Sequence, residues 1–262
     1  MKPEGIIRAQ SRQVLKGNWV AAVSGLLTLM AFGTLGDIIY SLLILLSGVF
    51  TDDGVLRHGA EVPLIIILCS VFIFIFALTP IVNGFFRLFY KLSDTGECDL
   101  REIFYFFCGT KNYFSALIFN ALMMLRRLLL ALIGFSPYIL FLIITNAFSQ
   151  SIYTSVSANE IMNAVAVVLI CLGIATSLVL WLRLTVYDFL FAGDASPRPF
   201  YDGRRILRKH YFDLVKLFFT FIPWILLCFF VLPMFYVVPY FMTSFATSVK
   251  WLFKLNKEGT TV

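Results

Sequence analysis

Ionisable side chains inside or beside long apolar stretches are the residues of this sequence best suited to chemistry. Arg126 and Arg127 form a doublet that begins thirteen residues after Tyr113, within one such stretch. Asp37 is the only acidic residue of the first stretch, and Asp188 follows the fourth. Because a charge in the hydrocarbon of a membrane costs several kcal/mol, these four residues are candidates for intramembrane or interfacial function.

Two interpretations of the arginine doublet remain open. A helix beginning at Tyr113 would place both guanidinium groups near the middle of a membrane, where they need partners or a water-filled cavity. Alternatively, Tyr113–Leu125 lies at the interface and Leu128–Ala147 is the span, so that both arginines extend to the cytoplasmic head groups. The second interpretation avoids the cost of an unpaired doublet in hydrocarbon.

Asp37 lies eighteen residues after Trp19, close to a full crossing at about 1.5 Å per residue. Gly33 and Gly36 precede it, so we expect the first span to kink or end near Gly36. Asp37 would then lie at the outer interface. The alternative is a pairing with an arginine inside the helical bundle.

Asp188 also takes part in a weak resemblance to the two aspartate motifs of intramembrane aspartyl proteases, through Tyr187-Asp188 and Gly193-Asp194. Those enzymes need two aspartates that face each other from separate helices, whereas these two are six residues apart. The sequence contains no H-E-x-x-H, G-x-S-x-G or phosphate-binding glycine loop. We therefore predict no enzyme activity, cofactor or metal.

The five cysteines predict neither a disulfide framework nor a zinc site. Their number is odd and no two form a C-x-x-C pair. We expect them to act as small buried hydrophobic residues. They are Cys69, Cys98, Cys108, Cys171 and Cys228.

The composition excludes a water-soluble domain. The 262 residues are 60% hydrophobic and only 14% charged, whereas soluble domains carry about 25% charged residues. A helix crossing the ~30 Å hydrocarbon layer needs about 20 apolar residues. We predict six spans, with the last apolar block divided near Leu232–Pro233. The blocks are Trp19–Phe50, Leu64–Phe86, Tyr113–Phe148, Ile161–Leu182 and Tyr211–Phe253.

The basic residues support this count and predict an orientation. With six spans, 18 of the 21 Lys and Arg residues fall on the side that holds both termini. The opposite side has only Arg57, and the loop Gln150–Glu160 has no basic residue. Because basic loops stay in the cytoplasm, both termini are predicted to be cytoplasmic. By the same topology, His58 and His210 lie on opposite sides.

An amphipathic helix is expected at Phe200–Leu214, where apolar and basic residues fall on opposite arcs. Such a helix lies along the cytoplasmic membrane surface with its basic face toward anionic head groups. His210 is expected to be an interfacial residue of it, and Asp213 to pair with Lys209 or Lys216 at helical spacing. The predicted head-group contacts are Arg198, Arg204, Arg205, Arg208 and Lys209.

Two further surface helices are expected. Ile7, Ser11, Val14 and Leu15 oppose Arg8, Arg12 and Lys16 near the start of the chain. Asp99-x-x-Glu102 is a capping box that opens a helix with Leu100, Ile103, Phe104 and Phe107 on one face. The chain is therefore an all-α integral membrane bundle, a single domain over 1–262. We infer three units, each a surface helix followed by a hairpin, over residues 1–92, 93–190 and 191–262.

Several stretches resemble a known family. They are "LKGNW" (Leu15–Trp19), "NGFFRLFYKLSDTGECDLREIFYFF" (Asn83–Phe107), "HYFDLVKLFFTFIPWILL" (His210–Leu227) and "VPY" (Val238–Tyr240). In this order they resemble domain-of-unknown-function family nine-seven-five, uncharacterised bacterial multi-pass membrane proteins. The family's Pro-Gly turn between the third and fourth spans is not kept, since no glycine follows Pro137. The resemblance implies a helical protein of the bacterial cytoplasmic membrane and carries no activity or site residues.

The leading functional hypothesis is a non-enzymatic accessory, scaffold or assembly protein that engages anionic lipid and other membrane proteins. The alternative is a small-solute or ion transporter or channel, with Asp37, Arg126 and Arg127 lining a path. An intramembrane enzyme is less favoured. Nucleic-acid binding is not expected, because the basic face is shared with the bilayer surface.

Overall fold

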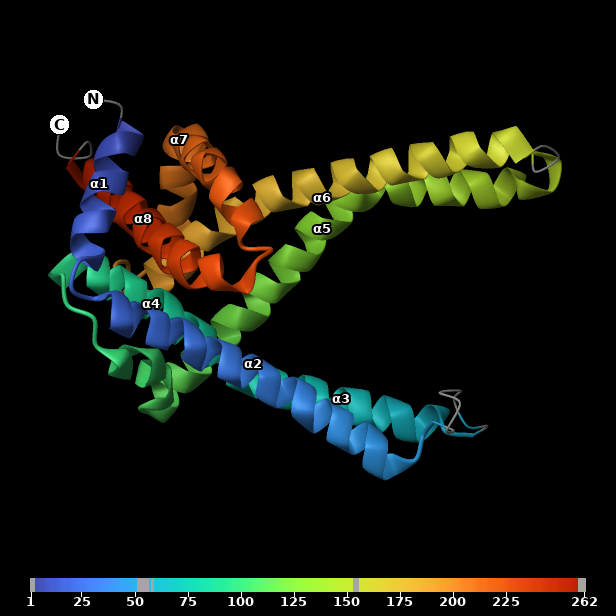
Figure 1. Ribbon diagram of the computed structural model, residues 1–262, viewed down its shortest axis with the longest axis horizontal. Coiled ribbons are helices and arrows are strands. Elements are labelled where there is room, and N and C mark those ends of the chain that lie inside the picture. Colours follow the sequence, from blue (N-terminus) through green and yellow to red (C-terminus); the bar gives the residue numbers. More distant parts are fainter. Residues whose placement is uncertain (1–2, 51–56, 58, 153–155, 259–262) are drawn as a thin grey trace.

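Helical hairpins that diverge from a common base make up the molecule. The computed structural model describes residues 3–50, 57, 59–152 and 156–258, and the side chains of residues 5–50, 57, 59–145 and 160–256. These residues form helices and no strand. The hairpins α2–α3 and α5–α6 extend in one direction from a base that holds α1, α4, α7, α8 and both ends of the chain (Figure 1). The elements are α1 (Pro3–Leu15), α2 (Trp19–Ser47), α3 (Glu61–Leu78), α4 (Pro80–Thr95), the 3₁₀-helix η1 (Leu100–Phe107), α5 (Thr110–Ile152), α6 (Val156–Ala192), α7 (Pro199–Leu227) and α8 (Val231–Glu258).

Six segments of the described chain are long and apolar enough to cross a bilayer, as predicted. The chain is therefore a multi-pass, all-α membrane protein. The six candidate spans are Trp19–Ser47, Glu61–Thr95, Thr110–Thr145, Glu160–Ala192, Pro199–Leu227 and Val231–Asn256.

The division between the last two spans lies slightly earlier than predicted. α7 ends at Leu227 and α8 begins at Val231, so the turn falls on residues 228–230 and not at Leu232–Pro233. Pro233 lies in the first turn of α8. A proline is tolerated there because the first N–H groups of a helix have no intrahelical partner.

α8 is the central helix of the base, and its small polar residues make that position possible. In its most apolar stretch 56% of the residues are buried, against 6% in α2 and in α5. Thr243 and Thr247 donate hydrogen bonds to the carbonyl groups of Pro239 and Thr243, each four residues earlier. Their polarity is thus satisfied within the helix, and their small size permits close packing. Ser11 of α1 lies 3.4 Å from the Thr247 hydroxyl.

The first surface helix has the face that the sequence predicted. Ile7, Ser11 and Leu15 of α1 are buried, and Arg12 and Lys16 on the other face are exposed. The buried side lies against α8, because Ser11 contacts Thr247. The exposed Arg12 also reaches α8, where its guanidinium donates to the Tyr240 hydroxyl at 3.1 Å. α1 therefore packs against α8 through its buried face.

The second surface element is a 3₁₀-helix, and the predicted face is wrong for that reason. A 3₁₀-helix repeats every three residues, so Ile103 and Phe106 lie on its buried side. Leu100, Phe104 and Phe107 were expected to share a face with Ile103, but they are exposed.

The predicted capping box forms only in part. The Asp99 carboxylate accepts a hydrogen bond from the backbone N–H of Arg101 at 2.9 Å, as a capping residue does. The Glu102 carboxylate does not return to the Asp99 N–H. It bonds Arg87 of α4 instead.

The third surface helix is the first part of α7, and it packs against protein. α7 bends at His210, whose φ of −124° and ψ of 18° are not helical. Before the bend, Ile206 and Leu207 are buried, and Gly203 lies against the Tyr187 ring of α6. The apolar arc that the sequence predicted therefore covers α6, while the basic arc remains outside.

The cysteines are not buried, contrary to the prediction. Cys69, Cys108 and Cys171 are exposed, Cys98 and Cys228 are half-buried, and all five have free thiols. Cys69 and Cys171 lie on hairpins whose apolar side chains mostly face outward. An apolar run in a membrane span therefore does not place a cysteine in a protein core.

Gly84 of α4 allows η1 to pack directly on the helix backbone, because a Cβ at this position would overlap the carbonyl group of Ile103. We expect Gly84→Ala to destabilise the protein by about 1–3 kcal/mol, the usual cost of overpacking. The measurement is the Tm of the detergent-solubilised protein. The control is Gly5→Ala in α1, where a Cβ meets nothing within 4 Å. Equal Tm values for the two variants would contradict the prediction.

Candidate functional site

A buried arginine joins three elements in the base. The Arg87 side chain of α4 is 7% exposed and forms ion pairs with Glu102 of η1, at 2.5 Å, and with Asp194, which follows α6. It donates a further hydrogen bond to the Ala192 carbonyl oxygen at 3.1 Å. Its guanidinium lies 3.5 Å from the centre of the Tyr105 ring. We call Arg87, Glu102, Tyr105 and Asp194 the Arg87 hub.

The hub anchors the loop that leads into α7. Asp194 has a left-handed backbone with φ of 50°, which aspartate tolerates better than most residues. Two residues later the Ser196 hydroxyl bonds the Asp202 carboxylate and accepts a hydrogen bond from the Arg198 N–H at 3.0 Å. The loop between α6 and α7 is thus tied to Arg87 at one end and to α7 at the other.

A second buried ion pair connects α5 to α6. Arg127 donates to the Asp188 carboxylate at 2.7 Å, and the Asp188 side chain is only 3% exposed while that of Arg127 is 37% exposed. The structure therefore brings together two of the four candidate charges. A carboxylate buried this deeply stays ionised only while an arginine is paired with it.

Arg126 makes different contacts from its neighbour. Its guanidinium lies 4.0 Å from the centre of the Phe200 ring and 5.8 Å from that of Tyr187. Arg126 is exposed, and no carboxylate of the described residues pairs with it. Stacking on an aromatic ring holds a guanidinium in place without neutralising its charge.

Arg126 lines an open pocket of about 610 Å³ between α5, α6 and α7. We call it the arginine pocket, and define it by Arg126, Arg183, Tyr187, Phe200, Tyr201 and Arg204. Its remaining wall is aliphatic, formed by Leu129, Leu130, Ile133 and Leu184. The pocket thus combines three cations and three aromatic rings with an apolar side.

Asp37 is not part of this site. α2 continues through it to Ser47 and ends at Gly48, which has a left-handed φ of 57°, so the predicted kink or end near Gly36 is wrong. Gly36 is buried instead because α3 approaches it, and a Cβ there would lie 3.4 Å from Ile75. Asp37 is exposed, and no ion pair joins it to another described residue.

Three aspartates near the base have three different basic partners. Asp188 binds Arg127 and Asp194 binds Arg87, so the two aspartates do not face each other as a protease pair does. Asp213 lies 3.2 Å from the His210 ring. The predicted pairing of Asp213 with Lys209 or Lys216 is wrong, because the bend at His210 turns the ring toward the carboxylate.

The predicted head-group contacts lie mostly outside the pocket. Arg198, Arg208 and Lys209 are exposed and Arg205 is half-buried, whereas Arg204 lines the pocket. His58 lies outside the described residues. Within the described chain, no group of three or more His, Cys, Asp and Glu residues could hold a metal ion.

Sequence reasoning missed the Arg87 hub and three of the residues that line the arginine pocket. Arg87 was counted only as a topology signal, although the aromatic residues on either side of it in "FFRLFY" indicate a buried arginine. Arg183, Phe200 and Tyr201 carry no local signal, because their pocket forms only when α6 and α7 pack.

Comparison with known proteins gives one match. The sequence profile of a family described as "Protein of unknown function (DUF975)" matches residues 1–250. Neither the curated proteins nor the solved structures contain a match.

The Arg127–Asp188 pair gives a stability prediction. Arg127→Leu leaves a buried carboxylate without its cation, and we expect a loss of about 3–5 kcal/mol in the free energy of unfolding. The double variant Arg127→Leu/Asp188→Leu should recover most of that loss, because an apolar pair of similar volume replaces a buried ion pair well. Denaturant titration in detergent measures both, with the exposed Arg101→Leu as control. A double variant no more stable than Arg127→Leu would contradict the pairing.

Cys98, between α4 and η1, gives a pH prediction. Burial raises the pKa of its thiol to about 11, and the negative charge of Asp99 acts in the same direction. Since only the thiolate reacts, alkylation of Cys98 should be slow at pH 7 and rise about tenfold per pH unit up to pH 10. Iodoacetamide labelling of a variant that keeps only Cys98 measures this, and a variant that keeps only the exposed Cys108 is the comparison. A Cys98 rate that does not change between pH 7 and 10 would contradict it.

Proposed function

The chain belongs to the DUF975 family, and we propose that it is a non-enzymatic accessory or scaffold protein of the bacterial cytoplasmic membrane. Both termini lie in the cytoplasm. The base engages anionic lipid through its cations, and the two long hairpins present apolar surface to lipid and to partner helices.

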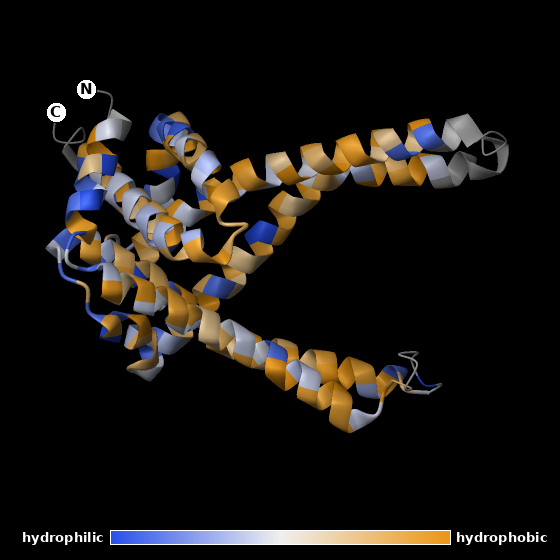
Figure 2. Cartoon of the chain, viewed as in Figure 1, coloured by the Kyte–Doolittle hydropathy of each residue, from blue (hydrophilic) through white to orange (hydrophobic). Residues whose placement is uncertain are grey.

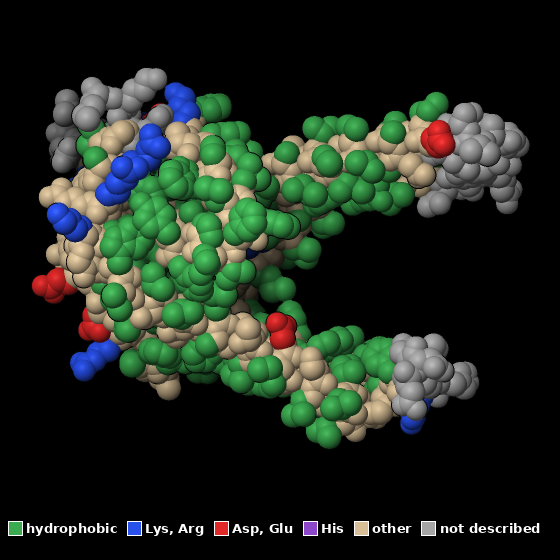
Figure 3. Space-filling model, in the orientation of Figure 1, with side chains coloured by type: hydrophobic (Ala, Val, Ile, Leu, Met, Phe, Trp, Pro, Cys, Tyr) green, Lys and Arg blue, Asp and Glu red, His purple; other side chains and the backbone are tan. Residues whose placement is uncertain are grey.

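The distribution of polar and apolar residues carries this proposal. The hairpins are hydrophobic along most of their length, and hydrophilic residues gather toward the base (Figure 2). In the space-filling view apolar side chains cover both hairpins, and most of the visible Lys and Arg lie on the base (Figure 3). In the most apolar stretches of α2, α5 and α6, only 6%, 6% and 11% of the residues are buried. Such surfaces require lipid or other transmembrane helices around them.

The ionisable groups of the hairpins support a scaffold better than a transporter. Within the described residues, α2 carries only one charged residue, Asp37, and the stretches Leu128–Thr145 and Ile161–Leu182 carry no Asp, Glu, Lys or Arg. A path for a polar solute needs polar or charged groups along its walls. The transport hypothesis has Asp37, Arg126 and Arg127 line one path, but Asp37 does not line the pocket that contains Arg126.

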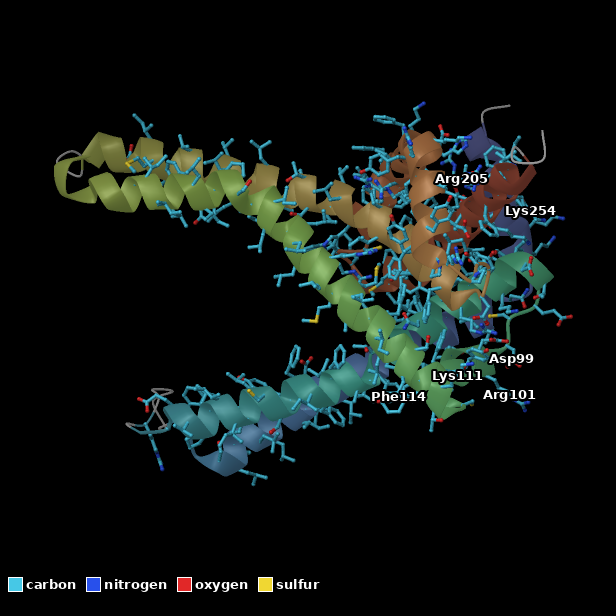
Figure 4. All side chains as sticks on the ribbon, turned by 180° about the vertical axis from the view of Figure 1, so that it is seen from behind. Asp99, Arg101, Lys111, Phe114, Arg205 and Lys254 are labelled. Atoms are coloured by element: carbon cyan, nitrogen blue, oxygen red, sulfur yellow. The ribbon has the colours of Figure 1, made fainter. Side chains whose placement is uncertain are left out.

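The cytoplasmic orientation follows from the basic residues. Arg101, Lys111, Arg205 and Lys254 all lie in the base, on the side of the molecule from which the hairpins depart (Figure 4). The two chain ends lie there too (Figure 1). Because Lys and Arg near span ends are retained in the cytoplasm, the base faces the cytoplasm and the hairpin tips face outward.

The proposal predicts that a reporter active only in the cytoplasm is active at either end of the chain. It also predicts that liposomes containing the purified protein move ions and small solutes no faster than empty liposomes. Reporters on opposite sides would refute the topology. A solute flux that Arg126→Ala abolishes, and that the exposed Arg101→Ala leaves intact, would replace the scaffold by a transporter.

A further inference from the structure

Five arginines of α4, α5, α6 and α7 fall into two groups. Arg87 and Arg127 are bound by carboxylates. Arg126, Arg183 and Arg204 pair with no carboxylate of the described residues, yet they come from three different helices to line one pocket. Cations that converge without acidic partners repel one another, and an anion between them offsets that cost.

The arginine pocket contains groups that suit a phosphate. No Asp or Glu lines it. The Arg126 guanidinium is oriented by the Phe200 ring at 4.0 Å, and that of Arg183 lies 5.4 Å from the Tyr211 ring. Arginine binds phosphate through paired N–H groups, and a guanidinium already held in place loses less side-chain entropy on binding. Tyr187 and Tyr201 line the same pocket, and a tyrosine hydroxyl is a hydrogen-bond donor.

An apolar hollow on the α5–α6 hairpin adjoins the arginine pocket at Ile133, which lines both. This second hollow, which we call the apolar groove, has a volume of about 490 Å³, and its other lining residues include Gly134, Pro137, Val179 and Leu180. No charged residue lines that second hollow. A free phosphate would use only the cationic end, whereas an amphiphile with an anionic head and an alkyl chain matches both ends.

The position of the pocket along the spans is that of lipid head groups. Arg126 and Arg127 immediately precede the uncharged stretch Leu128–Ile152 of α5, and Arg183 immediately follows the uncharged stretch Ile161–Leu182 of α6. At about 1.5 Å per residue these stretches are roughly 38 Å and 33 Å long, enough to cross the ~30 Å hydrocarbon layer. Both helices thus place an arginine where the hydrocarbon ends.

We propose that the arginine pocket binds one anionic phospholipid. Its phosphate lies between Arg126, Arg183 and Arg204, and one acyl chain follows the groove past Ile133. This proposal rests on the proposed function, which places the chain in the membrane. It adds that one lipid molecule binds each chain at one defined site.

Native mass spectrometry of the full chain in detergent, titrated with phosphatidylglycerol or phosphatidylcholine, tests this. The wild type should retain one phosphatidylglycerol per chain, at least tenfold more tightly than phosphatidylcholine. The triple variant Arg126→Gln/Arg183→Gln/Arg204→Gln should weaken the retention at least tenfold. The control Arg101→Gln/Lys111→Gln/Lys254→Gln removes the same charge from exposed residues outside the pocket, and should bind within twofold of the wild type.

Two further measurements keep the outcome decisive. Ile133→Trp obstructs the groove without a change in charge, and should weaken binding at least tenfold even if the triple variant does not fold. Inorganic phosphate at millimolar concentration should not displace the lipid, and displacement would identify a phosphate site instead. Equal lipid retention by the triple variant and its control would overturn the lipid site. The proposed function would still stand in that case, provided that both terminal reporters are active in the cytoplasm and the liposomes show no solute flux. Flux or a split topology would overturn the proposed function whatever the lipid count.

Discussion

The burial of the Arg87 guanidinium between Glu102 and Asp194 is the interaction on which the base depends. A buried arginine is tolerated only where carboxylates and carbonyl oxygens satisfy its N–H groups. Here those acceptors come from η1 and from the end of α6, so one side chain fixes two elements against α4. The loop that contains Asp194 leads directly into α7, which supplies Phe200 and Arg204 to the arginine pocket. The hub thus anchors the loop that leads to two residues of the pocket.

Membrane solvation explains the features that the sequence could predict. A span is an uninterrupted apolar run, and the side on which Lys and Arg gather is a matter of simple counting, so neither depends on tertiary contacts. The six spans, the amphipathic α1 and the helix before His210 are confirmed for this reason. The same solvent explains the error over the cysteines. Apolar residues on a span face lipid as often as protein, so Cys69 and Cys171 are exposed.

The features that could not be predicted depend on contacts between distant parts of the chain. Asp194 lies 107 residues after Arg87, and Asp188 lies 61 residues after Arg127, so no local spacing indicates either pair. Glu102 shows how a distant partner can displace a local one. Its spacing from Asp99 fits a capping box, but a buried guanidinium is the stronger partner for a carboxylate than a backbone N–H at the surface.

The hairpins α2–α3 and α5–α6 diverge from one base, so each is held at one end by the packing around α4 and α8 (Figure 1). α2 has 29 residues, a rod of roughly 43 Å at about 1.5 Å per residue. If α2 tilts by about 10° about its end in the base, its far end moves by about 8 Å. A small change of packing at the base would therefore displace the far end of the hairpin by several times that amount.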